Sequence, residues 1–200
     1  MTGAEALSLS IVDLAAAYRR KEVGPVEVAE AALDRIARLD PKLNSFVLVT
    51  ADIARRQAKQ AQEDLARGVD RGPLHGVPIG LKDLYATKGI RTTANSRVLM
   101  DWVPDHDATA VSKLNKAGTV LLGKLGMHEF AFGGPAKDAA FPPSRNPWNP
   151  DHVTGGSSSG SGAAWPRGCA TVPSVPTLAA QSGTQPTCAA WPASSPRTAW

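Results

Sequence analysis

The sequence predicts an α/β protein in which helices come first and a strand–helix–strand unit follows. Two observations predict this class. Up to about residue 68, apolar residues recur at helical spacing between capping and breaking residues, whereas residues 75–124 hold two short apolar runs on either side of a helical pattern. A strand, a crossover helix and a second strand favour parallel pairing inside a larger α/β sheet.

Three helices are expected at the start. In the first, the apolar positions are Leu9, Val12, Leu14 and Tyr18, with Ser8 or Ser10 as the N-cap. The second begins at Pro25 and stops before Pro41, because the residue before a proline disfavours helical geometry. The third covers residues 50–68 and ends at Gly68.

The strand–helix–strand unit follows these helices. Residues 75–83, "HGVPIGLKD", read as a short buried strand, and residues 119–124, "TVLLGK", as the next. Between them, residues 107–118 read as a helix that is capped near Asp105 or Asp107 and closed by Gly118.

Composition bounds the class of protein. The 200 residues suffice for one core, and 42% hydrophobic with 20% charged residues is typical of a globular domain. No apolar run approaches the roughly 20 residues of a membrane span, and the N-terminus lacks a signal-peptide pattern. We therefore expect a cytoplasmic protein that does not bind a membrane.

The net charge of +4 does not by itself predict a nucleic-acid partner. Lysine and arginine alternate with aspartate and glutamate along the expected helices, which is typical of a solvated face. Only two cysteines are present, Cys169 and Cys188, too few for a zinc site or a disulfide framework. No metal is expected.

Two segments carry candidate chemistry. Lys82 ends the apolar run "GVPIGLKD", where removal from water would lower its pKa and let the free amine act as a base. The alternative is an ordinary strand-end lysine that points to solvent or pairs with Asp83. Residues 155–164, "GGSSSGSGAA", combine flexible backbone with hydroxyls, although such a run alone is more often a linker. A linker has no need of the "RNPW" that precedes it.

Taken in order, "GVPIGLKD", "TTANSR", "DATAVSKLNKAGTVLLGKLGMHEFA", "RNPWNP" and "GGSSSGSGAA" resemble the amidase signature family over roughly residues 8–164. That family includes bacterial amidases and the A subunit of the glutamyl-tRNA amidotransferase. The resemblance implies the N-terminal part of the amidase signature fold: helices that lead into a mixed, largely parallel sheet flanked by helices, incomplete here. It also implies hydrolysis of amide C–N bonds in a small-molecule substrate without a cofactor.

The resemblance further implies a serine–serine–lysine triad. By motif matching, Lys82 is the lysine and Ser157 the bridging serine, which carries a cis peptide in the family; Ser158 and Ser159 are discounted. The family's nucleophile lies about two dozen residues further on, in a segment like "GTDTGGSIR" that also supplies the oxyanion donors. Here that place reads "VPTLAAQSG", with Gln181 at the expected position and Ser182 beside it.

The tail explains the missing nucleophile. Residues 165–200 contain no Lys, Asp or Glu but both cysteines, three tryptophans and six prolines. Back-translated and read one base earlier, Val175–Gly183 is compatible with "GTDTGGSIR", which places a serine at position 181. We therefore expect a partial amidase domain at residues 1–164, and an out-of-frame, disordered tail from one lost base near codon 164. The chain as written is expected to be inactive.

Two other functions stay open. The parent protein could be the A subunit of a tRNA-dependent amidotransferase, which uses the same chemistry on glutamine and passes ammonia to partner subunits. Alternatively, the scaffold could bind partners without catalysis, with the proline-rich "VPSVP" of the tail as a ligand for an aromatic groove.

Overall fold

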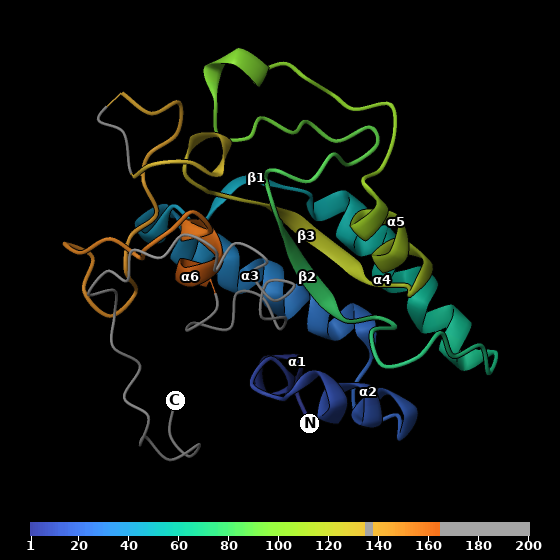
Figure 1. Cartoon of the computed structure of the whole chain (residues 1–200). Coiled ribbons are helices and arrows are strands. Elements are labelled where there is room, and N and C mark those ends of the chain that lie inside the picture. Colours follow the sequence, from blue (N-terminus) through green and yellow to red (C-terminus); the bar gives the residue numbers. More distant parts are fainter. Residues whose placement is uncertain (135–137, 165–200) are drawn as a thin grey trace.

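Three strands lie side by side in the order β1–β3–β2 at the centre of the molecule (Figure 1). The structure is a computed structural model that describes residues 1–134 and 138–164. Strand β2 (Pro78–Lys82) runs parallel to β3 (Val120–Leu125), and β1 (Phe46–Val49) pairs with β3 in the antiparallel sense. Helix α5 (Thr109–Lys116) is the crossover between β2 and β3. The α/β class and the parallel pair are confirmed.

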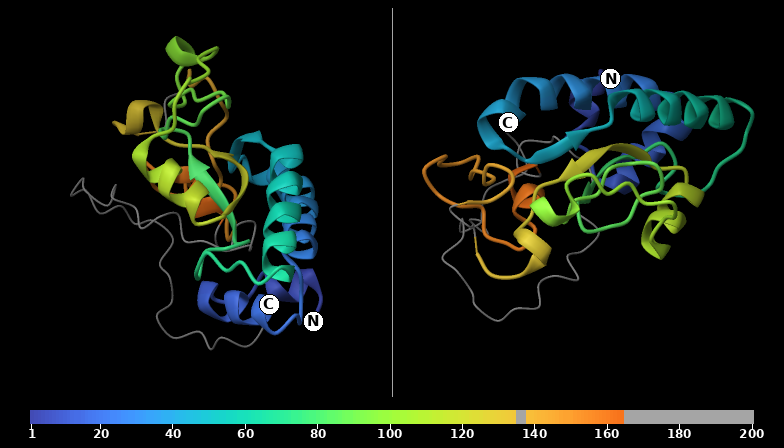
Figure 2. Two further views of the ribbon diagram at one scale, coloured as in Figure 1. Left: turned by 90° about the vertical axis from the view of Figure 1, so that its right-hand side faces the viewer. Right: turned by 90° about the horizontal axis from the view of Figure 1, so that it is seen from above.

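Helices cover both faces of this small sheet. Long helices α3 (Pro25–Leu43) and α4 (Ala51–Ala66) pack on each other and on one face, while α6 (Ser159–Ala164) contacts β2 and β3. Figure 2, left, shows α3 and α4 together on one side of the strands and α5 and α6 on the other. The short helix α1 (Gly3–Ala6) packs on α3 beside α2 (Ile11–Arg19).

The expected stop before Pro41 is wrong. Helix α3 continues through Pro41 to Leu43, where Asn44 closes it in the left-handed conformation with a φ of 52°. Pro41 removes one backbone donor from the last turn of α3, and the helix continues for only two residues beyond it. The Asp40 carboxylate also accepts hydrogen bonds from the backbone N–H groups of Ser45 and Phe46, at 2.6 and 3.2 Å. These bonds fix the turn into β1.

Other boundaries differ by short segments. Strand β1 and helix α1 were not expected, and α4 ends two residues before Gly68, which has a φ of +82°. Ser10 caps α2 as predicted and accepts from Asp13 N at 3.2 Å. Val12, however, is 70% exposed, so the expected apolar face of this helix is wrong at that position.

The cap expected for α5 is wrong. The N-cap residue is Ala108, with no side-chain hydrogen bond. Asp107 instead accepts from the backbone N–H of Lys88 at 2.7 Å and from Asn115 Nδ2 at 3.0 Å. Its carboxylate therefore ties the long segment before α5 to the helix. Gly118 closes α5 as expected, with a φ of +76°.

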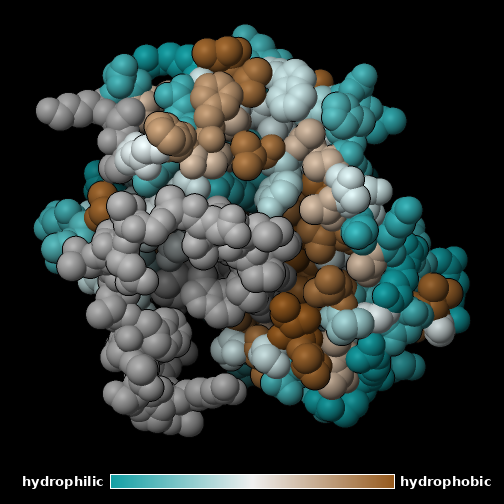
Figure 3. All heavy atoms as spheres, in the orientation of Figure 1, coloured by the Kyte–Doolittle hydropathy of each residue, from teal (hydrophilic) through white to brown (hydrophobic). Residues whose placement is uncertain are grey.

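The core forms between the sheet and helices α3 and α4. Every residue of β2 and β3 is buried, including the side chains of Lys82 and Lys124. The segment between β2 and α5, which includes the 3₁₀ turn η1 (Arg97–Leu99), exposes Val98, Trp102 and Val103. Hydrophobic residues gather over this segment at the top of Figure 3. Within the described ranges, no helix is both long and apolar enough to cross a membrane.

Candidate active site

Lys82 ends β2 at the carboxyl edge of the parallel pair, where its partner in register is Leu125 of β3. The residue is 7% exposed, and its amine donates a hydrogen bond to Ser157 Oγ at 2.9 Å. The alternative in which Lys82 points to solvent or pairs with Asp83 is therefore wrong. The strand delivers the amine to a loop 75 positions away in the sequence.

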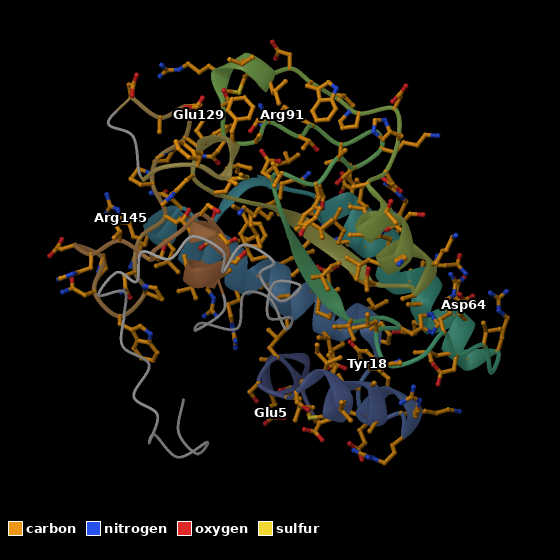
Figure 4. All side chains as sticks on the ribbon, in the orientation of Figure 1. Glu5, Tyr18, Asp64, Arg91, Glu129 and Arg145 are labelled. Carbon is orange, nitrogen blue, oxygen red and sulfur yellow. The ribbon has the colours of Figure 1, made fainter. Side chains whose placement is uncertain are left out.

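The segment before that loop is a closed turn and not a linker. Arg145 and Val153 form an isolated antiparallel bridge, and the backbone N–H of Asn146 donates to the carbonyl of His152 at 3.0 Å. Arg145 N also donates to the carbonyl of Leu43 at the end of α3, at 2.8 Å. In Figure 4, Arg145 marks this turn at the edge of the molecule, beside α6. The turn fixes where the glycine–serine run begins.

Ser157 follows a cis peptide bond between Gly156 and Ser157. Gly155, just before it, has a φ of +79°, a conformation that glycine adopts without a steric penalty. The carbonyl of Ser157 accepts from the backbone N–H of His128 at 3.0 Å. Helix α6 begins two residues later, at Ser159. The expected bridging serine thus has the cis peptide that the resemblance implied.

The segment after β3 holds this loop tightly. A Cβ atom on Gly156 would overlap the ring of His128, and a Cβ atom on Gly160 would overlap the carbonyl of Ser45. Gly160 N donates to the carbonyl of Gly126 at 2.8 Å, and the His128 Nδ1 atom lies 2.8 Å from the Gly133 carbonyl. Only glycines allow such close contact at positions 156 and 160.

A pocket opens beside the loop. Its walls come from the residues that lead into the 3₁₀ turn η2 (Glu129–Ala131), from residues 139–144 and from the glycine–serine loop, and they include Asn95, His128, Glu129, Thr154, Gly155 and Ser159. The residues on both sides of Ser157 therefore line a concave surface. Among residues 1–134 and 138–164, no cluster of His, Cys, Asp or Glu has the form of a metal site.

Burial sets the electrostatics of the pair. Desolvation lowers the pKa of Lys82 below its usual range, because an ammonium group loses hydration when it is buried. A lower pKa gives a larger neutral fraction near pH 7, and only the neutral amine can accept a proton. Lys82 can therefore exchange a proton with the Ser157 hydroxyl.

Sequence reasoning missed the pairing of two charged side chains at the ends of the strands that carry this site. Asp83 and Lys124 are fully buried, and Lys124 Nζ lies 3.5 Å from Asp83 Oδ1. The signal was present, because "TVLLGK" places a lysine near the end of an apolar run just as "GVPIGLKD" does.

An α/β fold in which a buried strand-end lysine contacts the serine of a glycine–serine loop forms a candidate serine–lysine site. The chain belongs to the amidase family, whose model matches residues 27–172. Among curated relatives, the A subunit of the glutamyl-tRNA(Gln) amidotransferase of Geobacter metallireducens is 48% identical over 160 residues, which are 80% of this chain and 33% of the relative. The protein of the same name from Methylococcus capsulatus is 49% identical over 78% of this chain and 32% of its own length.

Solved structures of amidases share the fold. The peptide amidase of Stenotrophomonas maltophilia superposes with a TM-score of 0.73 at 35% identity, covering 80% of this chain and 34% of that one. A 6-aminohexanoate cyclic dimer hydrolase gives 0.73 at 30% identity, over 82% of this chain and 33% of the other. The chain spans about a third of the length of the relatives it matches. Gln181, Ser182, both cysteines and the whole expected tail, 165–200, lie outside the described residues.

Proposed function

We propose that this chain carries two members of the catalytic triad of an amidase, a hydrolase of carbon–nitrogen bonds. Lys82 is the base and Ser157 the bridging serine. The observation that carries the proposal is the 2.9 Å hydrogen bond between the buried amine and the Ser157 hydroxyl. Two such groups in contact form a path for a proton, and the third member is a nucleophilic serine.

In this mechanism, neutral Lys82 takes the proton of Ser157, and Ser157 takes the proton of the nucleophile as the nucleophile attacks the amide carbonyl. Ser157 then donates a proton to the leaving amine and takes one back from Lys82. An acyl-enzyme forms and water hydrolyses it, with the two side chains acting in the same order. Backbone N–H groups beside the nucleophile stabilise the oxyanion.

The chain as written is proposed to be inactive. Position 181, where the family's spacing from Ser157 places the nucleophile, holds glutamine, and no glycines precede Ser182. Loss of a triad member costs several orders of magnitude in rate, and the oxyanion donors of that segment are lost with it. The small amide substrate would approach through the pocket beside Gly155 and Ser159.

A second candidate is the A subunit of a tRNA-dependent amidotransferase. It is favoured because the curated relatives that bear this name reach 48–49% identity, above the 30–35% of the solved amidases. In that role, the same serine–lysine pair would release ammonia from glutamine, and partner subunits would receive it.

One comparison separates these functions. The gene restored by one base near codon 164 is expressed with its downstream sequence, and hydrolysis of an aryl amide is compared with release of ammonia from glutamine. A hydrolase acts on the aryl amide alone and without partners. For an amidotransferase subunit, we expect genes for partner subunits close to this gene. We also expect its glutaminase activity to rise when the partner subunits are added. The unrepaired chain is the control, and aryl-amide hydrolysis by it that Lys82→Ala abolishes would overturn the expectation of inactivity.

A further inference from the structure

Lys124 is a buried amine that the proposed mechanism does not use. The residue has no exposed surface, and its amine donates to the carbonyl of Tyr85 at 2.7 Å and to Thr92 Oγ1 at 2.7 Å. Thr87 Oγ1 lies at 3.2 Å, and Asp83 Oδ1 completes the surroundings at 3.5 Å. Within the described residues, Asp83 is the one charged group within ion-pair distance of this amine.

The two lysines lie on opposite faces of the parallel strands. Leu81 is in register with Lys124, and Lys82 with Leu125. Residues in register share a face, and consecutive residues alternate, so Lys124 points away from the face that carries Lys82 and Ser157. Asp83 follows Lys82 by one residue and therefore points to the face of Lys124.

Asp83 is anchored as firmly as Lys124. Its backbone N–H donates to the carbonyl of Leu125 at 3.0 Å, and its carbonyl accepts from Ala94 N at 3.0 Å. Its Oδ2 atom accepts from both the backbone N–H and the hydroxyl of Thr93. These contacts fix the chain immediately after Lys82, and the charge of the carboxylate is met by Lys124.

We propose that Lys124 and Asp83 are positioning residues for Lys82: they cancel each other's charge behind the strand, so that the amine of Lys82 is left to Ser157. The inference rests on the proposed role of Lys82 as a base. A buried ion pair contributes little to stability compared with apolar side chains of the same shape, so its presence here calls for another account.

The physical reason is the reach of a buried charge. Without Lys124, the carboxylate of Asp83 would favour the ammonium form of Lys82, the residue before it at the buried end of β2. It would therefore oppose the burial that lowers the pKa of Lys82, for which desolvation is the cause. Lys124, whose own pKa burial lowers to about 8 against the pull of Asp83, supplies the opposite charge.

The experiment measures the pKa of Lys82 in the full chain by competitive acylation with trace acetic anhydride between pH 6 and 11, read by mass spectrometry. Lys59, whose side chain is 76% exposed, is the internal reference. The variants are Lys124→Met, Asp83→Asn and the double change. Lys116→Met, on the exposed side of α5, is the matched control for loss of one lysine.

Charge compensation predicts a different result for each variant. Lys124→Met raises the pKa of Lys82 by about one pH unit, Asp83→Asn does not raise it, and the double variant returns to within about 0.3 units of the starting chain. A purely structural role would loosen the site and raise the pKa in all three variants in step with their loss of stability, which would overturn the proposal.

Two further outcomes are covered. If Lys124→Met does not fold, Asp83→Asn and the double variant decide, because a raised pKa in either one contradicts the proposal. An unchanged pKa in a folded Lys124→Met variant overturns it as well. Failure of the repaired gene to hydrolyse amides would overturn the proposed function while leaving this titration intact, so the two failures are distinguishable.

Discussion

The amine of Lys82, at the end of β2, donates a 2.9 Å hydrogen bond to the hydroxyl of Ser157, in the loop before α6. The strand pairing fixes one partner, and the contacts of the loop with residues 126–128 fix the other. Neither residue could be brought to this place by local structure alone, because 75 positions separate them.

Lys82 should titrate well below an exposed lysine of the same chain. Burial disfavours its charged form, so we expect the pKa of Lys82 to lie below its usual range, measured by competitive acylation with the exposed Lys59 as the reference amine. Equal pKa values for the two amines would show that Lys82 is hydrated, and the base assignment would then fail.

Gly156→Ala should disturb the loop that carries Ser157. The new methyl group overlaps the His128 ring, so we expect a loss of about 1–3 kcal/mol in the free energy of unfolding, measured by urea denaturation. Gly134→Ala is the matched control, because no atom of the described residues lies within 4 Å of the added atom, and it should change stability by less than about 0.5 kcal/mol. Combining Gly156→Ala with His128→Ala should cost less than the sum of the single changes. Full additivity would contradict the contact.

The buried amine of Lys124 should make stability rise with pH. Burial lowers its pKa to about 8 in the folded chain, against 10.5 for a hydrated lysine, so the unfolded chain binds more protons between these values. The free energy of unfolding should therefore increase from pH 8 to 10.5, by up to about 3 kcal/mol from this group. Lys124→Met should lack that rise and should be destabilised by about 3–5 kcal/mol at pH 7. Parallel pH profiles of the two proteins would contradict the account.

Asp64 lies near the end of α4 in Figure 4 and should contribute more to thermal stability than its acidic neighbours on the surface. Its carboxylate, only 5% exposed, accepts from Arg67, Gln60 and Arg71, and these bonds lower its pKa to about 2. Asp64→Asn should lower the thermal midpoint, with a difference from the parent that shrinks as pH falls from 3.8 towards 2. Asp70→Asn, which removes the exposed pair with Arg19, should have little effect. Equal shifts for both variants would show that burial of Asp64 adds nothing.

Much of the fold could be predicted because the breaking residues and the hydrophobic periodicity agree over residues 75–124. The apolar runs around Ile79 and Leu121, with Gly118 between helix and strand, allow one plausible order of elements. Strand β1 was missed although Phe46–Val49 is a run of apolar and β-branched residues, because four residues are too few to decide between strand and loop without the pairing with β3. Pro41 misled for a related reason: the hydrogen bonds of Asp40 outweigh the local preference of a proline.

The candidate site could likewise be predicted only in part from the sequence. Ser157 and Lys82 could be predicted because motif order identifies them together, and the structure brings their polar atoms into contact. The apolar run before Lys124 signals a buried lysine, but its pairing with Asp83 could not be predicted, since that pairing depends on the register of β2 and β3, which the sequence does not specify. The close contact between Gly156 and His128 likewise exists only once the loop is folded onto the end of β3.

The central claim is that Lys82 and Ser157 are two members of a catalytic triad whose nucleophile belongs at position 181. Covalent labelling tests this claim most directly. One base is restored near codon 164, and the resulting full-length protein is treated with a fluorophosphonate that reacts with activated serines. We predict labelling of the serine then encoded at position 181, none after that serine is changed to alanine, and a loss of about a thousandfold or more in rate with Lys82→Ala. Labelling that survives the alanine change, or a restored gene with no open frame beyond the tail, would contradict the account.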